Sequence, residues 1–417
     1  MTDRYAVFRL PDVRRALVSK FFLTLGIQMQ RVVVGWQVFQ LTHDPLALGM
    51  IGLAEALPYI ACLLWAGHQA DRRDQRRLIL LAESGLLACA VALWALARTP
   101  LTTPAPLYLV LALTGVCRSI LWPATTAYVD ATVPKAIYVQ AAGWNSTQWQ
   151  VGAILGPLVG GWLYAAHGVA WAYAGVAGWL ALAVCYARRL TPRPSRKIDA
   201  CASVPFSEWA ELLEGVRFVL ARQVILAALA LDLFAVLFGG VSAILPIFAE
   251  RFQVGAVGLG ALNAALPAGA LAMALYQAHR PLFHRTGLAL FAGVALFGAF
   301  TVGFALSPWF WLAACCLAAA GAADNISVVI RASILQAMTP NHLRGRVSAV
   351  NGFFIGSSNE IGAFESGVAA KLLGAVPSVI VGGCLTLVCV AVTAWRAPFL
   401  RRLMLHDVDS APSPPVL

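Results

Sequence analysis

The sequence predicts an all-α integral membrane protein with twelve transmembrane helices in two pseudo-symmetric six-helix halves. Three observations lead to this fold class. The 417 residues are 60% hydrophobic and only 12% charged, about half the charge of a typical soluble domain. Twelve apolar runs are each long enough to span a bilayer, for which about 20 residues suffice. A hydrophilic linker and a weak internal repeat divide these runs six and six.

The twelve predicted spans are continuous apolar segments, unlike the alternating strands of about 10 residues in a membrane β-barrel. They cover approximately residues 16–41, 46–67, 78–98, 106–128, 140–164, 169–187, 223–249, 256–278, 287–307, 309–337, 347–370 and 375–395. The first run follows a basic N-terminus, as a secretory signal peptide does. Because Gln28, Gln30 and Arg31 interrupt it and no small-x-small cleavage site is present, we expect a retained helix.

The basic residues predict the orientation of the chain. Of the 30 Lys and Arg residues, 24 fall in segments on the same side as the N-terminus, three on the opposite side and three within the spans. The positive-inside rule therefore places both termini in the cytoplasm of a bacterium. The net charge of +11 then reflects orientation, and we expect no nucleic-acid binding because the sequence contains no compact basic domain.

The longest hydrophilic stretch, residues 188–222, separates the two sets of six spans. Residues 206–220 place apolar side chains on one helical face and charged ones on the other, which predicts a short interfacial helix. The expected organisation is an N-terminal half (1–187), a cytoplasmic linker (188–222), a C-terminal half (223–396) and a cytoplasmic tail (397–417).

An internal repeat supports this division. Residues 53–58 resemble residues 262–267 at an offset of 209, and residues 131–145 resemble residues 337–351 at an offset of 206. Two similar offsets on equivalent segments indicate a duplicated six-helix unit. Parallel six-helix halves, with a substrate site between them near the bilayer midplane, are the layout of one large class of transporters.

The segment between the second and third spans reads GHQADRRDQRR over residues 67–77. A glycine here allows close helix contact, an aspartate can face a helix N-terminus or an arginine, and the arginines can form breakable ion pairs. We expect a cytoplasmic gate formed by Gly67, Asp71, Arg72, Arg76 and Arg77. A plain basic loop would explain the arginines but neither Gly67 nor Asp71.

This G-x-x-x-D-R-x-x-x-R-R pattern resembles the signature loop of the major facilitator superfamily. The family pattern usually has a glycine where this chain has Asp74 and a basic residue where it has Gln75. The resemblance implies a transporter that works by alternating access, with residues 67–77 helping to close the cytoplasmic side.

The fifth span contains a glycine stripe, GxxxGPxxGG. Glycines at i, i+4 and i+8 form a flat face for close helix contact, and the proline introduces a kink. The residues are Gly152, Gly156, Pro157, Gly160 and Gly161. The pattern resembles the motif of the antiporter branch of the superfamily and so implies export; plain helix packing is the alternative.

Two further regions narrow the branch. Residues 31–49 resemble the first hairpin, and residues 344–367 the eleventh span, of bacterial siderophore exporters related to the enterobactin exporter. The resemblance implies export of a small organic molecule such as a siderophore or a drug.

Eight charged residues fall within the predicted spans, where each costs about 2.5–3.5 kcal/mol and needs a cavity or a partner. They are Arg31, Glu55, Arg118, Asp232, Asp324, Arg331, Glu360 and Glu365. A carboxyl group in a nearly dry cavity can carry a proton, which makes Glu55, Asp232 and Asp324 candidates. An arginine stays charged and can hold an anionic or catechol-like substrate or a carboxylate, which suits Arg31 and Arg118.

Arg118 resembles the buried arginine that the superfamily associates with proton coupling. Several of the other charges have an alternative, structural interpretation. Asp324 and Arg331 lie seven residues apart on one helical side, and each can pair with a neighbouring span. Glu360 and Glu365 are expected in the periplasmic half of their span, where water can reach them. Glu83 is expected to be solvated near the cytoplasmic end of the third span.

Four tryptophans are also open to two interpretations. They can line the cavity for an aromatic substrate or serve as interfacial and packing residues. They are Trp36, Trp122, Trp144 and Trp149.

The combined expectation is a proton-coupled exporter of a small organic molecule in the bacterial inner membrane. A facilitative uniporter or importer and a lipid flippase are the alternatives. An enzyme is not expected, because the sequence lacks HExxH, GxSxG, P-loop and clustered Cys/His motifs. The expected partners are the substrate, protons and the lipid bilayer, with a monomeric protein, no cofactor and no metal.

Overall fold

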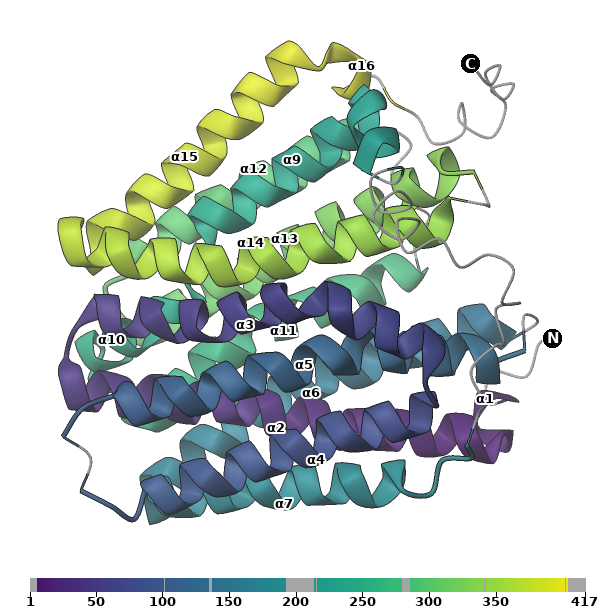
Figure 1. Cartoon of the computed structure of the whole chain (residues 1–417). Coiled ribbons are helices and arrows are strands. Elements are labelled where there is room, and N and C mark those ends of the chain that lie inside the picture. The colour runs from purple at the N-terminus through teal and green to yellow at the C-terminus, as the bar shows by residue number, and fades with distance from the viewer. Residues whose placement is uncertain are drawn as a thin grey trace. The chain divides into compact units, whose positions relative to one another are not determined.

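The computed structural model describes residues 6–100, 102–134, 137–192, 214, 216–279, 286–340, 343–401 and 403. Within these ranges the chain is predominantly helical and contains no β-strand. In each half of the chain long helices run side by side (Figure 1). The predicted all-α class is therefore confirmed.

Each half of the chain supplies a set of long helices. The first set is α2 (Pro11–Thr42), α3 (Pro45–Arg72), α4 (Gln75–Leu96), α5 (Ala105–Thr132), α6 (Tyr138–His167) and α7 (Val169–Ala187). The second set is α9 (Gln223–Gly239), α11 (Gly255–His279), α12 (Thr286–Leu306), α13 (Phe310–Met338), α14 (Arg344–Leu373) and α15 (Ala375–Arg396). The short elements are α1 (Ala6–Arg9), η3 (Ser242–Ile244), α10 (Leu245–Arg251) and α16 (Pro398–Arg401).

Ten helical segments of the described chain are long and apolar enough to cross a membrane. Helices α6 and α14 are not among them, although each is 30 residues long. Both are longer than a span requires and both carry polar residues in their N-terminal halves. When they are included, every predicted span corresponds to a helical segment of the structure.

One predicted span is not continuous. Residues 223–249 were expected as a single helix, but α9 ends at Gly239 and the chain resumes as η3 and α10. Two consecutive glycines, Gly239 and Gly240, favour this break, and Pro246 fits the first turn of α10.

Side-chain caps and glycines define several helix ends. Asp44 accepts a hydrogen bond from the Leu46 amide at 3.0 Å and starts α3. Gly168, between α6 and α7, has φ +87°, and Gly374, between α14 and α15, has φ +92°. Both glycines adopt backbone conformations that side-chain-bearing residues avoid, and they are 206 residues apart.

The pairs of helices that pack together in the first half of the chain recur in the second half, as the internal repeat of the sequence does. In the first half α2 packs against α6 and α7, α3 against α5, α4 against α5 and α7, and α6 against α7. In the second half α9 packs against α14 and α15, α12 against α13 and α15, and α14 against α15. Gly269 of α11 lies against the Ala318 carbonyl of α13, which matches the α3–α5 pair. This correspondence is the pseudo-symmetry predicted from the sequence offsets.

The chain divides into two compact units. Unit 1 comprises Met1–Cys201 and Ser242–Pro267, and unit 2 comprises Ala202–Val241 and Ala268–Leu417. The division follows the break after α9 and passes through α11 at Pro267. Of the expected interfacial helix, residues 206–213 and 215 lie outside the described part, whereas 214 and 216–221 are helical. The four-part organisation expected from the sequence stays a prediction.

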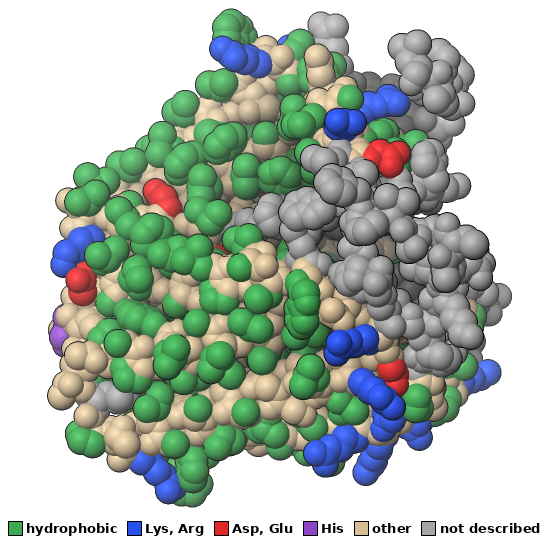
Figure 2. Space-filling model, viewed as in Figure 1, with side chains coloured by type: hydrophobic (Ala, Val, Ile, Leu, Met, Phe, Trp, Pro, Cys, Tyr) green, Lys and Arg blue, Asp and Glu red, His purple; other side chains and the backbone are tan. Residues whose placement is uncertain are grey.

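Large apolar side chains are widely exposed. Trp311, Leu372 and Trp395 have relative exposures of 75%, 77% and 78%. Hydrophobic side chains cover much of the face shown in Figure 2, and Lys and Arg gather toward the helix ends. So much exposed apolar surface is unusual for a soluble monomer and suits contact with lipid.

Candidate functional site

Glu55 is the buried centre of a charged cluster in unit 1. It lies within α3, is 6% exposed, and its carboxylate accepts a hydrogen bond and forms an ion pair with Arg118 of α5. Arg31 of α2 also interacts electrostatically with this carboxylate. Three helices thus bring together three charged residues that the sequence identified separately, without showing that they are neighbours.

The backbone geometry favours this pairing. A Cβ atom at Gly115 would overlap the backbone carbonyl oxygen of Glu55. Because Gly115 and Arg118 are three residues apart on one helix, they lie on the same face. Close approach of α3 and α5 at the glycine therefore holds the guanidinium group of Arg118 beside the carboxylate.

The cluster carries one more positive than negative charge. Arg31 is exposed and the Arg118 side chain is 25% exposed, compared with 8% for the Glu55 side chain. A buried carboxylate needs such pairing to offset its desolvation. Chemically, the cluster can hold a proton at Glu55 and can present guanidinium donors to an oxygen-rich ligand.

Unit 2 contains a different buried pair. Arg331 of α13 forms an ion pair with Asp232 of α9, and their side chains are 5% and 11% exposed. Asp324, on the same helix, forms no hydrogen bond or ion pair with any described residue. The repeat offset of 206 makes Asp324 the counterpart of Arg118, so the two units place opposite charges at equivalent positions.

The two glutamates of α14 lie apart from this pair. Glu365 is half-buried beside a shallow groove formed by Ile361, Phe364 and Val368. Glu360 is also half-buried and has interaction partners. The structure does not bring either glutamate into the Asp232–Arg331 pair within its unit.

Residues 67–77 form the end of α3 and the beginning of α4 rather than an extended loop. Asp74 caps α4 by accepting a hydrogen bond from the Arg76 amide at 3.0 Å, and Arg77 approaches the Asp74 carboxylate at 3.6 Å. Asp74, one of the two residues that depart from the family pattern, is therefore the helix cap. The side chains of Asp71 and Arg72 lie outside the described part of the chain.

Gly67 makes no close contact with another helix among the described residues, and its expected part in a gate stays a prediction. No described atom lies within 4 Å of a Cβ built at this position. In the described part of the chain, the packing around α3 at this position therefore does not require a glycine.

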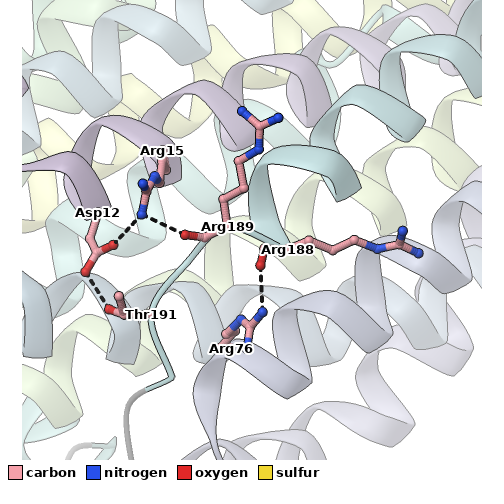
Figure 3. A network of polar contacts seen from close by, with 6 residues as sticks. All are labelled: Asp12, Arg15, Arg76, Arg188, Arg189 and Thr191. Carbon is pink, nitrogen blue, oxygen red and sulfur yellow. Dashed lines mark hydrogen bonds and ion pairs between the residues drawn. The ribbon is translucent and has the colours of Figure 1, made fainter.

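The arginines near this segment join a polar network in unit 1. Figure 3 shows Asp12, Arg15, Arg76, Arg188, Arg189 and Thr191. Arg76 donates to the Arg188 carbonyl at 2.6 Å and Arg15 to the Arg189 carbonyl at 2.9 Å. Cationic side chains at a helix C-terminus satisfy its free carbonyl groups and its dipole. The described bond of Arg76 is therefore to backbone rather than the acidic partner expected from the sequence.

The glycine stripe of α6 faces two helices. A Cβ at Gly156 would lie 2.8 Å from the Leu25 carbonyl oxygen of α2, and Gly152 and Gly160 also face α2. A Cβ at Gly161 would overlap the Ala256 carbonyl oxygen at the beginning of α11.

The reverse contact is equally tight. A Cβ at Gly260 of α11 would overlap the Pro157 carbonyl oxygen of α6. The two helices thus approach backbone to backbone in unit 1.

Glu83 contradicts the expectation of a solvated side chain. It is 2% exposed, because α4 packs between α5 and α7. The Ser19 hydroxyl of α2 lies 3.0 and 3.2 Å from its two carboxyl oxygens. The apolar neighbours of Glu83 in the sequence gave no sign that it would be paired with a serine 64 residues away.

Two of the tryptophans are packing residues. Trp36 is 8% exposed and lies beside Phe39, and Trp144 contacts Phe8 edge-on at a centroid distance of 4.7 Å. Trp122 and Trp149 are exposed. Among the described residues, no group of three His, Cys, Asp or Glu side chains could hold a metal ion.

The comparison with protein families decides the assignment. A profile of the Major Facilitator Superfamily matches residues 16–363. The chain belongs to this superfamily. The match extends from α2 into α14, so it includes the Glu55 cluster, residues 67–77 and the glycine stripe. The resemblance inferred from the motifs is thus confirmed.

Curated relatives include the enterobactin exporter EntS of Escherichia coli O6:K15:H31 (strain 536) and that of Shigella boydii serotype 18. Each is 27% identical over 399 residues, which cover 93% of this chain and 94% of the relative. The siderophore-exporter resemblance therefore extends over nearly the whole chain.

Solved structures show the same fold at low identity. A POT family transporter in complex with 5-aminolevulinic acid aligns with a TM-score of 0.76 at 11% identity, covering 93% of this chain and 96% of that chain. A mutant of the nucleoside transporter NupG aligns with a TM-score of 0.68 at 13% identity, covering 92% of this chain and 99% of that chain. Together with the apolar helices, the family match and the curated relatives identify a multi-pass membrane transporter of small molecules, which is not an enzyme class.

Proposed function

We propose that this protein is a proton-coupled exporter of a small, hydroxyl-rich organic molecule of the siderophore type. The observation that carries the proposal is the ion pair of the buried Glu55 with the partly buried Arg118, with Arg31 beside it. The similarity to enterobactin exporters over 93% of the chain supports the substrate class. The protein acts as a monomer in the bacterial inner membrane, with both termini in the cytoplasm.

Proton coupling follows from competition at Glu55. A catechol-type substrate donates its hydroxyl hydrogens to the Glu55 carboxylate, while Arg31 and Arg118 contact its oxygens. A proton that enters from the periplasm converts the carboxylate to a neutral acid and removes the acceptor. Affinity for the substrate falls and the molecule leaves on the periplasmic side.

The sign of this linkage depends on how the substrate is held. If an anion is bound only by the guanidinium groups, protonation of Glu55 frees Arg118 and strengthens binding. Proton and anion would then travel in the same direction. Only a substrate that uses the Glu55 carboxylate is exchanged against a proton.

Rocker-switch alternating access provides the movement. The α6–α11 contact at Gly161 has to separate when the periplasmic side opens. Residues 67–77 help to close the cytoplasmic side. Asp232–Arg331 keeps α9 and α13 together within unit 2.

Equilibrium binding tests the linkage. Purified protein in lipid nanodiscs is titrated with enterobactin, and separately with catechol, at several pH values. We expect affinity to rise with pH, by up to about tenfold per pH unit where one proton is released on binding. Glu55→Gln should bind the probe weakly, and the part of the pH dependence that comes from titration of the protein should be lost. Because the wild type and Glu55→Gln are titrated with the same probe, their comparison separates this part from the ionisation of the probe itself. Tighter binding at low pH would contradict antiport.

Metabolite profiles test the substrate. A deletion strain is compared with its parent for compounds retained inside the cell. Retention of a siderophore supports the proposal, whereas retention of a sugar or a nucleoside contradicts it.

A further inference from the structure

A small cavity of about 50 Å³ lies within unit 1 among α2, α4, α5 and α6. Its polar lining includes Ser19, Lys20, Glu83, Tyr128 and Asn145. None of the three residues of the Glu55 cluster lines it. A space of this size accommodates water, and the cavity is separate from the cluster.

The hydrogen-bond geometry around Ser19 constrains the protonation of Glu83. The Ser19 hydroxyl is 2.8 Å from the Ala183 carbonyl oxygen of α7, in addition to its contacts with both carboxyl oxygens of Glu83. A serine hydroxyl has one hydrogen to donate, and a backbone carbonyl oxygen can only accept. An ionised Glu83 would also only accept, which leaves two acceptors for one hydrogen.

A neutral Glu83 satisfies all three groups. Its carboxyl O–H donates to the Ser19 oxygen, and the Ser19 O–H donates to the Ala183 carbonyl oxygen. An ionised carboxylate that is 2% exposed would instead share a single hydrogen bond, which is poor compensation for a buried charge.

Among the described residues that line the cavity, Lys20 is the cation available to an ionised Glu83, yet it is not paired with it. Both side chains are described, both line the cavity, and no ion pair joins them. Tyr128 of α5 is the other titratable group that lines the cavity, α6 contributes the uncharged Asn145, and α7 contacts Glu83 through Ser19 only by a backbone carbonyl.

We propose that Glu83 is a second proton-binding site, occupied by a proton in this structure, and that Lys20 is its counter-ion once the proton leaves. Loss of the proton makes Glu83 a competitor with Ala183 for the Ser19 hydrogen. It also creates an attraction for Lys20 within the cavity. Proton release at this site therefore weakens the hydrogen-bonded connection of α2 to α7 and pulls α2 toward α4. The site is independent of the proposed transport function, because it concerns proton binding alone.

Infrared spectroscopy of the full-length protein in lipid vesicles tests this site without substrate or gradient. At pH 7 we expect the wild type to show a protonated-carboxyl C=O band that Glu83→Gln lacks. Glu55→Gln is the matched control, because the ion-paired Glu55 should contribute no such band. The amide of Glu83→Gln can donate to Ser19 as the acid does, so this variant should fold.

A second variant tests the counter-ion. In Lys20→Met, the Glu83 band should persist to higher pH, by about one pH unit, as expected from removal of a nearby positive charge. Equal band intensity in wild type and Glu83→Gln at pH 7 would overturn the proton site. An unchanged titration in Lys20→Met would overturn the role of Lys20. Failure of proton-coupled transport would leave both readouts intact.

Discussion

Gly115 of α5 lies directly against the backbone carbonyl of Glu55 in α3, the residue whose carboxylate pairs with Arg118 one turn further along α5. The glycine and the ion pair are therefore parts of one arrangement. Without the close approach, the guanidinium group would have to reach a carboxylate on a more distant helix.

Substitution of Gly115 should separate these two helices. We expect Gly115→Ala to lower the free energy of unfolding by about 1–3 kcal/mol, because overpacking forces backbone shifts. Gly143→Ala is the control, since no atom of a described residue lies within 4 Å of a Cβ there, and it should be neutral or slightly stabilising. Thermal unfolding in detergent measures both; equal destabilisation would contradict the packing argument.

The pair in unit 2 should behave as a buried ion pair. We expect Asp232→Asn to destabilise by about 3–5 kcal/mol, because it leaves Arg331 buried without a countercharge. The double variant Asp232→Asn/Arg331→Met should recover much of that loss. Unfolding temperatures of the two variants and of Arg331→Met give the coupling energy. Additive effects would show that the pair does not act as a unit.

The sequence predicted the fold more fully than the site. Apolar length determines the spans locally, so nearly every span could be predicted. The break after Gly239 depends on a glycine pair and a proline within one apolar run. Hydropathy averaged over a window of residues does not detect such single helix-breaking positions. The partners of Glu55 and Asp232 depend on how the helices are rotated and on close approach at a glycine. A local sequence pattern predicts neither the rotation nor the approach.

Arg76 and Arg77 should differ despite their adjacent positions. Arg76 donates to the Arg188 carbonyl at 2.6 Å, whereas the Arg77 side chain is 86% exposed. Arg76→Gln should cost about 1 kcal/mol by leaving that carbonyl without its charged donor. Arg77→Gln should have almost no effect on unfolding temperature. A larger loss of stability in Arg77→Gln than in Arg76→Gln would contradict the role of the Arg76 hydrogen bond shown in Figure 3.

The α6–α11 contact should depend on Gly161. Gly161→Ala places a methyl group against the Ala256 carbonyl, so we expect faster hydrogen–deuterium exchange in residues 255–260. Gly178→Ala is the matched control, because no atom in the described part of the chain lies within 4 Å of a Cβ there. Unchanged exchange in Gly161→Ala would show that the contact tolerates a side chain.

Glu83 shows a further limit of sequence interpretation. Its position near the expected membrane surface favoured a solvated side chain, and only the packing of α4 against α5 and α7 buries it. Its serine partner lies 64 residues away. A lone carboxylate near a helix end therefore needs the tertiary contacts before its role can be assigned.

The most direct test of proton-coupled export is transport in liposomes that contain the purified protein. Enterobactin flux is measured with an imposed proton gradient and again after a protonophore has collapsed it. We expect substrate to move against the direction of proton flow, flux to fall when the gradient is removed, and Glu55→Gln not to respond to the gradient. Equal flux with and without the gradient would contradict proton coupling.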